Sequence, residues 1–279
     1  MTRRPTLLSF CTIVKNEAHN LARCLASVKP YVDEMIIVDT GSTDDTVAIA
    51  QQYGAKVHHF EWCDDFAAAR NYSLSLVSGD WILSLDADEE LVVKWPQFRD
   101  RLNEPDAPLA YGINRIDLYE VGQVTGGLHL RLFRNQPDLH YQGRYHEQLQ
   151  SAAGPLVPMG LLDDLEILHY GNSDADILHK NLTRDIPILE KMRSEAGLDL
   201  WRLDCLARKY LKVGQAEQAQ NCYAEAMDRL LPHLVEGQPP EPFFWVPTLL
   251  EALGTQALEG EDLETLRLIC QKGLEWCPN

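Results

Sequence analysis

Hydrophobic and polar positions alternate along the first part of the chain in a way that predicts strands and helices in turn. Short apolar runs, typical of strands buried on both faces, are separated by segments with helical spacing. This alternation implies right-handed crossovers and a doubly wound, mostly parallel sheet, an α/β fold. The expected strands are Leu7–Val14, Met35–Val38, Lys56–Phe60 and Trp81–Leu85, and the expected helices are His19–Val28, a segment from Asp44 to Gly54, and Phe66–Val77.

The pattern is less regular from residue 91 to about residue 171. Val92 to Leu102 have the spacing of a helix that Pro96 interrupts. Further strands are expected at Ala110–Val121, Leu128–Phe133 and Leu165–His169, the first two separated by Gly122 and by Gly126 with Gly127.

After about residue 173 the strand patterns give way to helical ones. Ile177–Met192 is expected to form one helix, with a kink at Pro187. From residue 200 onward the spacing matches the tetratricopeptide repeat of about 34 residues, and a second, degenerate helical hairpin follows. We therefore expect an α/β domain over residues 1–173 and a helical, tetratricopeptide-like domain over residues 174–279. Packing between helices is enough to explain the repeat positions, which are Leu203, Leu206, Ala207, Tyr210, Gly214, Ala219, Tyr223 and Ala226.

Charge and cysteine content narrow the classes of function. The formal net charge of −17 argues against broad binding to nucleic acid or to an anionic membrane. No apolar run is long enough for a signal peptide or a membrane span. The seven cysteines lack zinc-like spacing and are expected to be reduced thiols in a cytoplasmic protein.

Acidic residues follow three of the expected strands. Glu17 and Asp39 come after the first and second strands, and Asp86 and Asp88 come directly after the strand that starts at Trp81. In open α/β sheets ligands bind at the carboxyl ends of the strands, and two acids in Asp-x-Asp spacing suit a hard divalent cation that also holds a substrate phosphate. Solvated surface acids are the alternative for this motif, but convergence at one edge favours a nucleotide pocket.

Four motifs together resemble the family 2 glycosyltransferases. They are Cys11–Glu17, Val38–Asp44, Ala69–Asn71 and Leu85–Asp88, and the resemblance extends to residues 128–171 and loosely to the helical tail. The branch most similar is bacterial, has a tetratricopeptide-like tail and includes the sublancin-type peptide S-glycosyltransferases. The resemblance implies a GT-A fold, a nucleotide-diphosphate sugar as donor, Mg²⁺ or Mn²⁺ as cofactor, and inversion at the anomeric carbon.

The resemblance also implies which residues bind the nucleotide-sugar. Asp39 would accept a hydrogen bond from the imide N–H of uracil, and Arg70 would contact the base or the diphosphate, with an ion pair to Asp64 or Asp65 as the alternative. Arg131 and Arg134 would reach the diphosphate. The full set of expected nucleotide-sugar residues is Thr12, Val14, Asn16, Glu17, Asp39, Arg70, Asn71, Asp86 and Arg131.

Metal and base assignments come from the same resemblance. Asp88 and His169 would bind the metal ion, with a structural, hydrogen-bonded histidine as the alternative for His169. Glu147 is the candidate catalytic base, although the family commonly has a Glu-Asp pair where this chain has His146 and Glu147. The alternative role for Glu147 is a salt bridge with Arg144 or Arg131.

The expected function is transfer of a hexose or N-acetylhexosamine from a UDP-sugar to a soluble acceptor, with a peptide or protein among the candidate acceptors. The Gln-x-x-Arg-Trp motif of processive synthases is absent, which favours single additions. The helical tail would bind the acceptor or form a homodimer. Two alternatives stay open at this point. One is a catalytically dead scaffold that acts through its helices, and the other is a nucleotidyltransferase, which usually has a Gly-rich basic loop where this chain has Lys15–Glu17.

Overall fold

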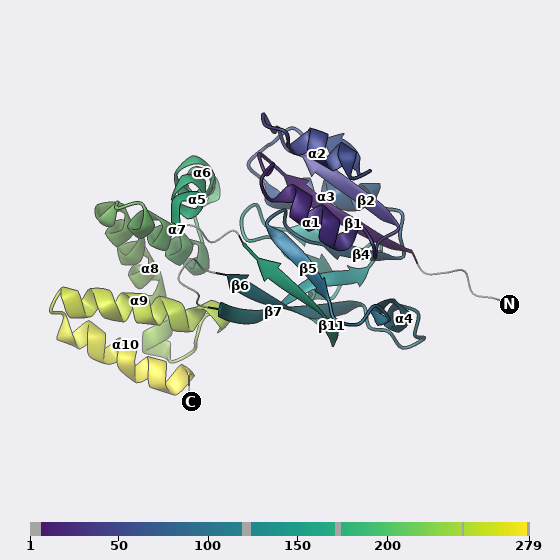
Figure 1. Ribbon diagram of the computed structural model, residues 1–279. Helices are drawn as coiled ribbons and strands as arrows, with labels where there is room; N and C mark the ends of the chain where they lie inside the picture. Colours follow the sequence, from purple (N-terminus) through teal and green to yellow (C-terminus); the bar gives the residue numbers. More distant parts are fainter. Residues whose placement is uncertain (1–6, 119–123, 171–173, 242, 278–279) are drawn as a thin grey trace. The chain divides into compact units, whose positions relative to one another are not determined.

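The chain folds into two compact units, which the computed structural model describes over residues 7–118, 124–170, 174–241 and 243–277 (Figure 1). The units are Met1–Ile177 and Leu178–Asn279, close to the boundary expected after residue 173. The first holds a mostly parallel sheet and the second is helical, so the expected fold class is confirmed. Within the described ranges, no helix combines the length and the apolar character needed to cross a membrane.

A sheet of eight strands, counted over the described residues, forms the centre of the first unit in the order β3-β2-β1-β4-β7-β6-β11-β5. Strands β1 to β4 are parallel and match the four expected strands. Since β7 is antiparallel to both β4 and β6, and β11 is parallel to β6, six of the strands run in one direction. Their bounds are β1 Leu8–Val14, β2 Glu34–Asp39, β3 Lys56–His59, β4 Trp81–Ser84, β5 Glu89–Val93, β6 Ala110–Leu118, β7 Val124–Arg134 and β11 Gly160–His169.

Both faces of this sheet are covered, as the continuous apolar strands predict. Alternate β1 residues serve the two cores, with Phe10 packed on one face and Cys11 on the other. Helices α1 (Leu21–Val28), α2 (Thr46–Gln52) and α4 (Phe98–Leu102) contribute to the first core. The second core includes residues of α3 (Phe66–Leu76) and of a small sheet formed by β8 (His140–Gln142), β9 (Gln148–Ser151) and β10 (Gly154–Pro155).

Two expectations for residues 91–134 are wrong. The first two residues of the expected helix, Val92 and Val93, end strand β5, because Leu91 to Val93 pair with β11 and this tertiary pairing overrides the helical spacing. A helix, α4, forms only after Pro96. Gly126 and Gly127 do not separate two strands but lie inside β7, opposite Ile116 and Arg115. Gly122 lies outside the described residues.

The helices from α5 onward form the helical part of the chain. They are α5 (Asp174–Lys180), a π-helical turn (Asn181–Asp185), α6 (Ile186–Ala196), α7 (Leu200–Lys212), α8 (Ala216–Glu236), a 3₁₀ turn (Phe243–Trp245), α9 (Val246–Glu259) and α10 (Leu263–Trp276). The single helix expected over Ile177–Met192 is therefore interrupted before Pro187, which has no N–H to donate to the preceding turn. The helical repeat positions of α7 and α8 are buried, as expected for packing between paired helices.

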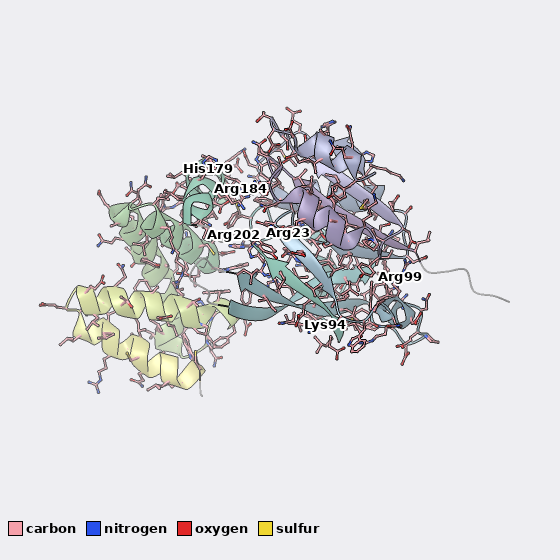
Figure 2. All side chains as sticks on the ribbon, in the orientation of Figure 1. Arg23, Lys94, Arg99, His179, Arg184 and Arg202 are labelled. Atoms are coloured by element: carbon pink, nitrogen blue, oxygen red, sulfur yellow. The ribbon has the colours of Figure 1, made fainter. Side chains whose placement is uncertain are left out.

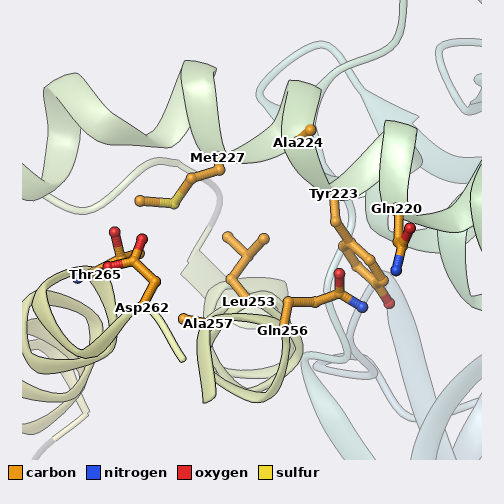
Figure 3. A pocket seen from close by; sticks show the side chains of 9 residues that line it. All are labelled: Gln220, Tyr223, Ala224, Met227, Leu253, Gln256, Ala257, Asp262 and Thr265. Atoms are coloured by element: carbon orange, nitrogen blue, oxygen red, sulfur yellow. Dashed lines mark hydrogen bonds between the residues drawn. The ribbon is translucent and has the colours of Figure 1, made fainter. Parts of the chain in front are cut away.

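A pocket of about 340 Å³ lies between α8, α9 and the start of α10 (Figure 3). Leu253 lies at the centre of the wall, between Met227 on one side and Tyr223 on the other, and the amides of Gln220 and Gln256 lie on the Tyr223 side. The pocket belongs entirely to the helical unit.

Candidate active site

The carboxyl ends of the parallel strands bring the expected acids to one edge of the sheet. The register aligns Asp39 with Val14 and Ser84 with Cys11, so the Asp86–Asp88 segment leaves β4 at the level of Asp39. Since β2 and β4 are both neighbours of β1, they lie about 10 Å apart. A nucleotide can span this distance along the edge.

Asp39 ends β2 with its carboxylate buried and oriented by the next turn. Gly41 N donates to Oδ2 at 3.2 Å and Ser42 N donates to Oδ1 at 3.1 Å. His59 Nδ1 lies 3.2 Å from Oδ2. These contacts fix the direction in which the carboxylate faces.

The loops that follow β1 and β2 are tied together by side-chain hydrogen bonds. Asn16 N donates to Ser42 Oγ at 2.9 Å, and Asn16 Oδ1 accepts from Thr43 N at 2.7 Å. Glu17 N donates to Thr46 Oγ1 at 2.8 Å. Asn16 has a φ of 56°, in the left-handed region that Asn tolerates. The two loops therefore form one rigid rim beside Asp39.

Thr12 and Val14 lie beneath this rim and not on it. Their exposed fractions are 1 % and 3 %, and the Val14 side chain belongs to the core on the α1 face. Thr12 and Val14 are two positions apart on a strand that is buried on both faces, so both side chains lie in the interior. The expectation that they line the nucleotide is not supported for their side chains.

Arg70 joins two of the expected site residues. It lies on α3 with a side chain that is 10 % exposed, and its Nη2 donates to Asp86 Oδ1 at 2.7 Å. Its Nε donates to Glu147 Oε1. Arg70 thus pairs with Asp86 and Glu147, while Asp65, one of the alternative partners, caps α3 by accepting from Ala68 N.

Arg131 binds the other oxygen of the Asp86 carboxylate, and a β-bulge positions it. Tyr111 pairs with Leu132 and the adjacent Gly112 pairs with Leu130, so Arg131 has no opposite residue on β6. Its Nη2 donates to Asp86 Oδ2 at 2.7 Å and to Glu89 Oε1 at 2.6 Å.

Asp86 and Glu89 respond differently to these cations. Burial raises the pKa of the Asp86 carboxyl, but the charges of Arg131 and Arg70 outweigh burial and hold this pKa far below its usual range. Glu89 has a side chain with no exposed surface, and burial raises its pKa although Arg131 acts in the opposite direction. Glu89 also accepts from Asp86 N at 2.9 Å, which fixes the turn of the motif.

Asp88 directly precedes β5 and lies beside His169, the last residue of β11. His169 Nε2 is 3.6 Å from Asp88 Oδ2, and His169 Nδ1 is 2.7 Å from Asp117 Oδ1. Burial lowers the pKa of His169, but Asp88 and Asp117 outweigh burial and raise this pKa above its ordinary value. Arg115 pairs with Asp117 at 3.1 Å and with Glu89 at 3.6 Å.

A second cluster holds the segment around Asp88. Arg23, labelled on α1 in Figure 2, lies 3.7 Å above the centre of the Tyr170 ring. The Tyr170 hydroxyl donates to Glu90 at 2.7 Å and Tyr170 N donates to the Asp88 carbonyl at 2.9 Å. These contacts fix the backbone on either side of the Asp88–His169 pair.

Two expected ligand contacts have structural roles instead. The amide of Asn71 donates to the Tyr141 carbonyl at 2.8 Å and accepts from Tyr141 N at 2.7 Å, so it joins α3 to β8. The two ends of a side-chain amide match the two polar groups of a peptide unit, which explains the contact. Arg134 lies over the Trp81 ring and donates to the carbonyls of Ala107 and Pro108.

Sequence reasoning missed four polar side chains in and beside this network: Glu89, Arg115, Asp117 and His129. Arg115 and Asp117 alternate on a strand, so their spacing does place them on one face of β6. His129 lies on β7, where burial, followed by the nearby charges of Arg115 and Arg131, lowers its pKa to about 4. A polar pair within an expected strand is the signal that could have identified Arg115 and Asp117.

The donor atoms at this edge fit a hard divalent cation. Within the described part of the chain, no group of three or more His, Cys, Asp and Glu side chains is arranged to hold a metal ion. A carboxylate and an imidazole suit Mg²⁺ or Mn²⁺ where phosphate oxygens and water complete the coordination. The network joins five carboxyl side chains to three arginines, and a divalent cation beside Asp88 would add positive charge to its acidic end.

Comparisons with known proteins identify a repeat-containing protein and several glycosyltransferases that are similar to this chain. A TPR repeat-containing protein of Synechococcus elongatus is 52 % identical over 141 residues, which are 50 % of this chain and 34 % of that protein. An uncharacterized glycosyltransferase of Rickettsia felis is 52 % identical over 84 residues, 30 % of this chain and 29 % of that protein. The SPbeta prophage-derived glycosyltransferase SunS of Bacillus subtilis is 29 % identical over 187 residues, 64 % of this chain and 43 % of SunS.

The chain thus spans less than half the length of these relatives. Among solved structures, glucosyl-3-phosphoglycerate synthase of Mycobacterium tuberculosis is 26 % identical, with coverage of 40 % of this chain and 44 % of that one, at a TM-score of 0.32. The family model described as glycosyl transferase family 2 matches residues 9–153, more than half of the chain. The chain therefore belongs to the family 2 glycosyltransferases.

Proposed function

We propose that the chain transfers a hexose or N-acetylhexosamine from a UDP-sugar to an acceptor, with inversion at the anomeric carbon and with Mg²⁺ or Mn²⁺ as cofactor. The observation that carries the proposal is the Asp88–His169 pair, which lies at the same edge of the sheet as Asp39 and beside the arginines that hold Asp86. Acidic metal ligands next to buried arginines suit a diphosphate, which needs positive charge on both sides.

Asp39 accounts for the choice of uracil. Its carboxylate accepts from two backbone N–H groups and is held in one orientation. A carboxylate at this position can accept from the imide N–H of uracil, whereas cytosine offers no N–H at the equivalent ring atom. The joined loops of Asn16, Glu17 and Ser42 provide the rim against which base and ribose would lie.

Arg70 and Arg131 position the diphosphate. Both are held by Asp86, so their guanidinium groups are oriented before the donor binds. A cation held by Asp88 and His169 would supply charge neutralisation on the departing diphosphate. Arg70 and Arg131 would also neutralise negative charge on the diphosphate.

Glu147 is the candidate base that takes the proton of the acceptor nucleophile. Arg70 holds its Oε1, and Oε2 is the atom that would accept the proton. The turn before it includes His146 at a φ of 54°, a conformation that few non-glycine residues adopt without a local reason.

The helical unit is the proposed site for a peptide or protein acceptor. Its pocket combines apolar side chains, Tyr223, Met227 and Leu253, with the amides of Gln220 and Gln256, a mixture that suits an extended peptide (Figure 3). A second copy of the chain is the other candidate for this unit, and sedimentation of the chain with and without an acceptor peptide separates the two.

The test of the proposed function is donor hydrolysis, which needs no knowledge of the acceptor. The chain is incubated with Mn²⁺ and UDP-glucose, UDP-galactose or UDP-N-acetylglucosamine, and UDP release is measured. We expect slow release with one donor, loss of release in Asp88→Ala, and unchanged release in Asp163→Asn, a substitution of a mostly exposed acid. Absence of both release and calorimetric binding for every donor would contradict the proposal.

A further inference from the structure

The two ring nitrogens of His169 face two different carboxylates. Nδ1 lies 2.7 Å from Asp117 Oδ1, a full hydrogen bond, and Nε2 lies 3.6 Å from Asp88 Oδ2, a longer contact. His169 and Asp117 are opposite one another on the neighbouring parallel strands β11 and β6. The contact is therefore set by the register of two strands in the sheet and not by a loop.

The hydrogen bond to Asp117 decides where the neutral imidazole carries its proton. A neutral imidazole has one N–H, and a carboxylate at hydrogen-bond distance from Nδ1 keeps the proton on that nitrogen. Nε2 then has a lone pair, and this lone pair faces Asp88. One oxygen of Asp88 and one nitrogen of His169 thus point to the same small region.

Arg115 keeps Asp117 suited to this task. Its Nη2 lies 3.1 Å from Oδ1 and 3.3 Å from Oδ2 of Asp117. Asp117 thus faces N–H donors of Arg115 at both of its oxygens and His169 Nδ1 at Oδ1, and a carboxylate in this position accepts hydrogen bonds from both side chains.

We propose that Asp117 is a positioning residue that holds His169 in the Nδ1–H tautomer, so that Nε2 and Asp88 Oδ2 together present a site for one divalent cation. A carboxylate that orients a ligating histidine through its other nitrogen is a recurrent arrangement around protein-bound metals. The tautomer is a property of the metal-free chain, whereas the identity of the cation rests on the proposed function.

A purely structural role for Asp117 makes a different prediction. If the bond to His169 only joined β6 to β11, its loss would lower the free energy of unfolding without changing the site. The two strands are already paired along the residues that lead up to this contact, from Asn114 to Asp117. Measurements of the His169 tautomer and of the metal affinity therefore distinguish the positioning role of Asp117 from a purely structural one.

The first experiment uses nitrogen NMR of the full chain with labelled histidine, without metal and at a pH well above the pKa of His169. We expect the Nδ1–H tautomer in the wild type. In Asp117→Asn, the oxygen of the new amide keeps the hydrogen bond from Arg115, so the amide N–H₂ faces His169 Nδ1. Nδ1 then has to accept a hydrogen bond, and the imidazole proton should move to Nε2. An Nε2–H tautomer in the wild type, or no change in the variant, would overturn the inference. The wild-type spectrum decides even if the variant does not fold.

The second experiment measures Mn²⁺ affinity in the presence of UDP by calorimetry. We expect Asp117→Asn to weaken Mn²⁺ binding about 10- to 100-fold. The same substitution in a His169→Ala background should have no further effect, because the residue it positions is gone. The positioning role is overturned if Asp117→Asn leaves the Mn²⁺ affinity unchanged while His169→Ala weakens it. An unchanged affinity in His169→Ala contradicts the metal site of the proposed function, and the spectrum of the metal-free chain still decides the role of Asp117.

Discussion

Arg131 donates to Asp86 across 2.7 Å, and the same nitrogen donates to Glu89 across 2.6 Å. One cation is thus shared between a partly exposed acid of the motif and a fully buried one. Through this sharing, the site is a single network of alternating charges that runs from α3 to β11. Its members, in order of contact, are Glu147, Arg70, Asp86, Arg131, Glu89, Arg115, Asp117, His169 and Asp88.

Replacement of Arg131 should destabilise the first unit. In Arg131→Met the Glu89 carboxylate loses its closest cation while it remains fully buried. Removal of one partner from a buried ion pair costs about 3–5 kcal/mol, so we expect a loss of about 3 kcal/mol in the free energy of unfolding. Urea unfolding at pH 7 measures it.

The matched control for Arg131→Met is the double variant with Glu89→Gln. A neutral amide needs no cation, so the double variant should recover a large part of the lost stability. If the double variant is less stable than Arg131→Met alone, Glu89 does not depend on Arg131 in the way described.

The two aspartates of the motif should have separable effects. Asp88 faces His169, and Asp86 holds Arg70 and Arg131. Asp88→Asn should weaken Mn²⁺ binding at least about 10-fold, because a charged ligand becomes neutral, with little change in stability. Asp86→Asn should instead cost about 2 kcal/mol of stability, because two arginines lose a charged acceptor. Calorimetry and urea unfolding on both variants test this, and identical effects on Mn²⁺ binding would contradict it.

The sequence predicts the first half of the sheet well because its strands are buried on both faces. The apolar run from Trp81 has to be a strand, and an acid that follows such a strand has to lie at its carboxyl edge. The register of β1 with β2 and β4 then brings Asp39 and Asp86 to one level. For these elements local pattern and tertiary packing agree.

The second half of the sheet and several contacts of the site depend on pairing between distant segments, which local spacing does not encode. Leu91 to Val93 form a strand because β11, some seventy residues later, offers a pairing edge. Arg131 reaches Asp86 because the β6–β7 register shifts at Gly112. Asn71 is occupied by Tyr141 because α3 meets the small sheet. Each of these contacts needs the assembled sheet before it can be identified.

Glu147→Gln should reduce catalysis with little effect on donor binding. An amide cannot accept a proton from the nucleophile, so we expect kcat for donor hydrolysis to fall about 10²- to 10⁴-fold while KM changes only slightly. Steady-state UDP release measures both constants. A wild-type kcat would show that Glu147 serves only as the partner of Arg70.

Glu34 should make the first unit sensitive to acid. Its carboxylate accepts from Ser9 Oγ, Ser78 N and Lys56 Nζ. Burial raises its pKa, but these hydrogen bonds outweigh burial and lower the pKa from 4.5 to about 2. A carboxyl whose pKa is lower in the folded protein than in the unfolded chain stabilises the fold at pH values above the unfolded pKa. This stabilisation is lost as the pH falls through the folded pKa.

Glu34→Gln should therefore cost about 2 kcal/mol of the free energy of unfolding at pH 7, and the difference between this variant and the wild type should shrink between about pH 4.5 and pH 2. Urea unfolding across this range measures the difference, with the exposed Glu104→Gln as the matched control. A difference that stays constant with pH would show that the hydrogen bonds to Glu34 do not depend on its charge.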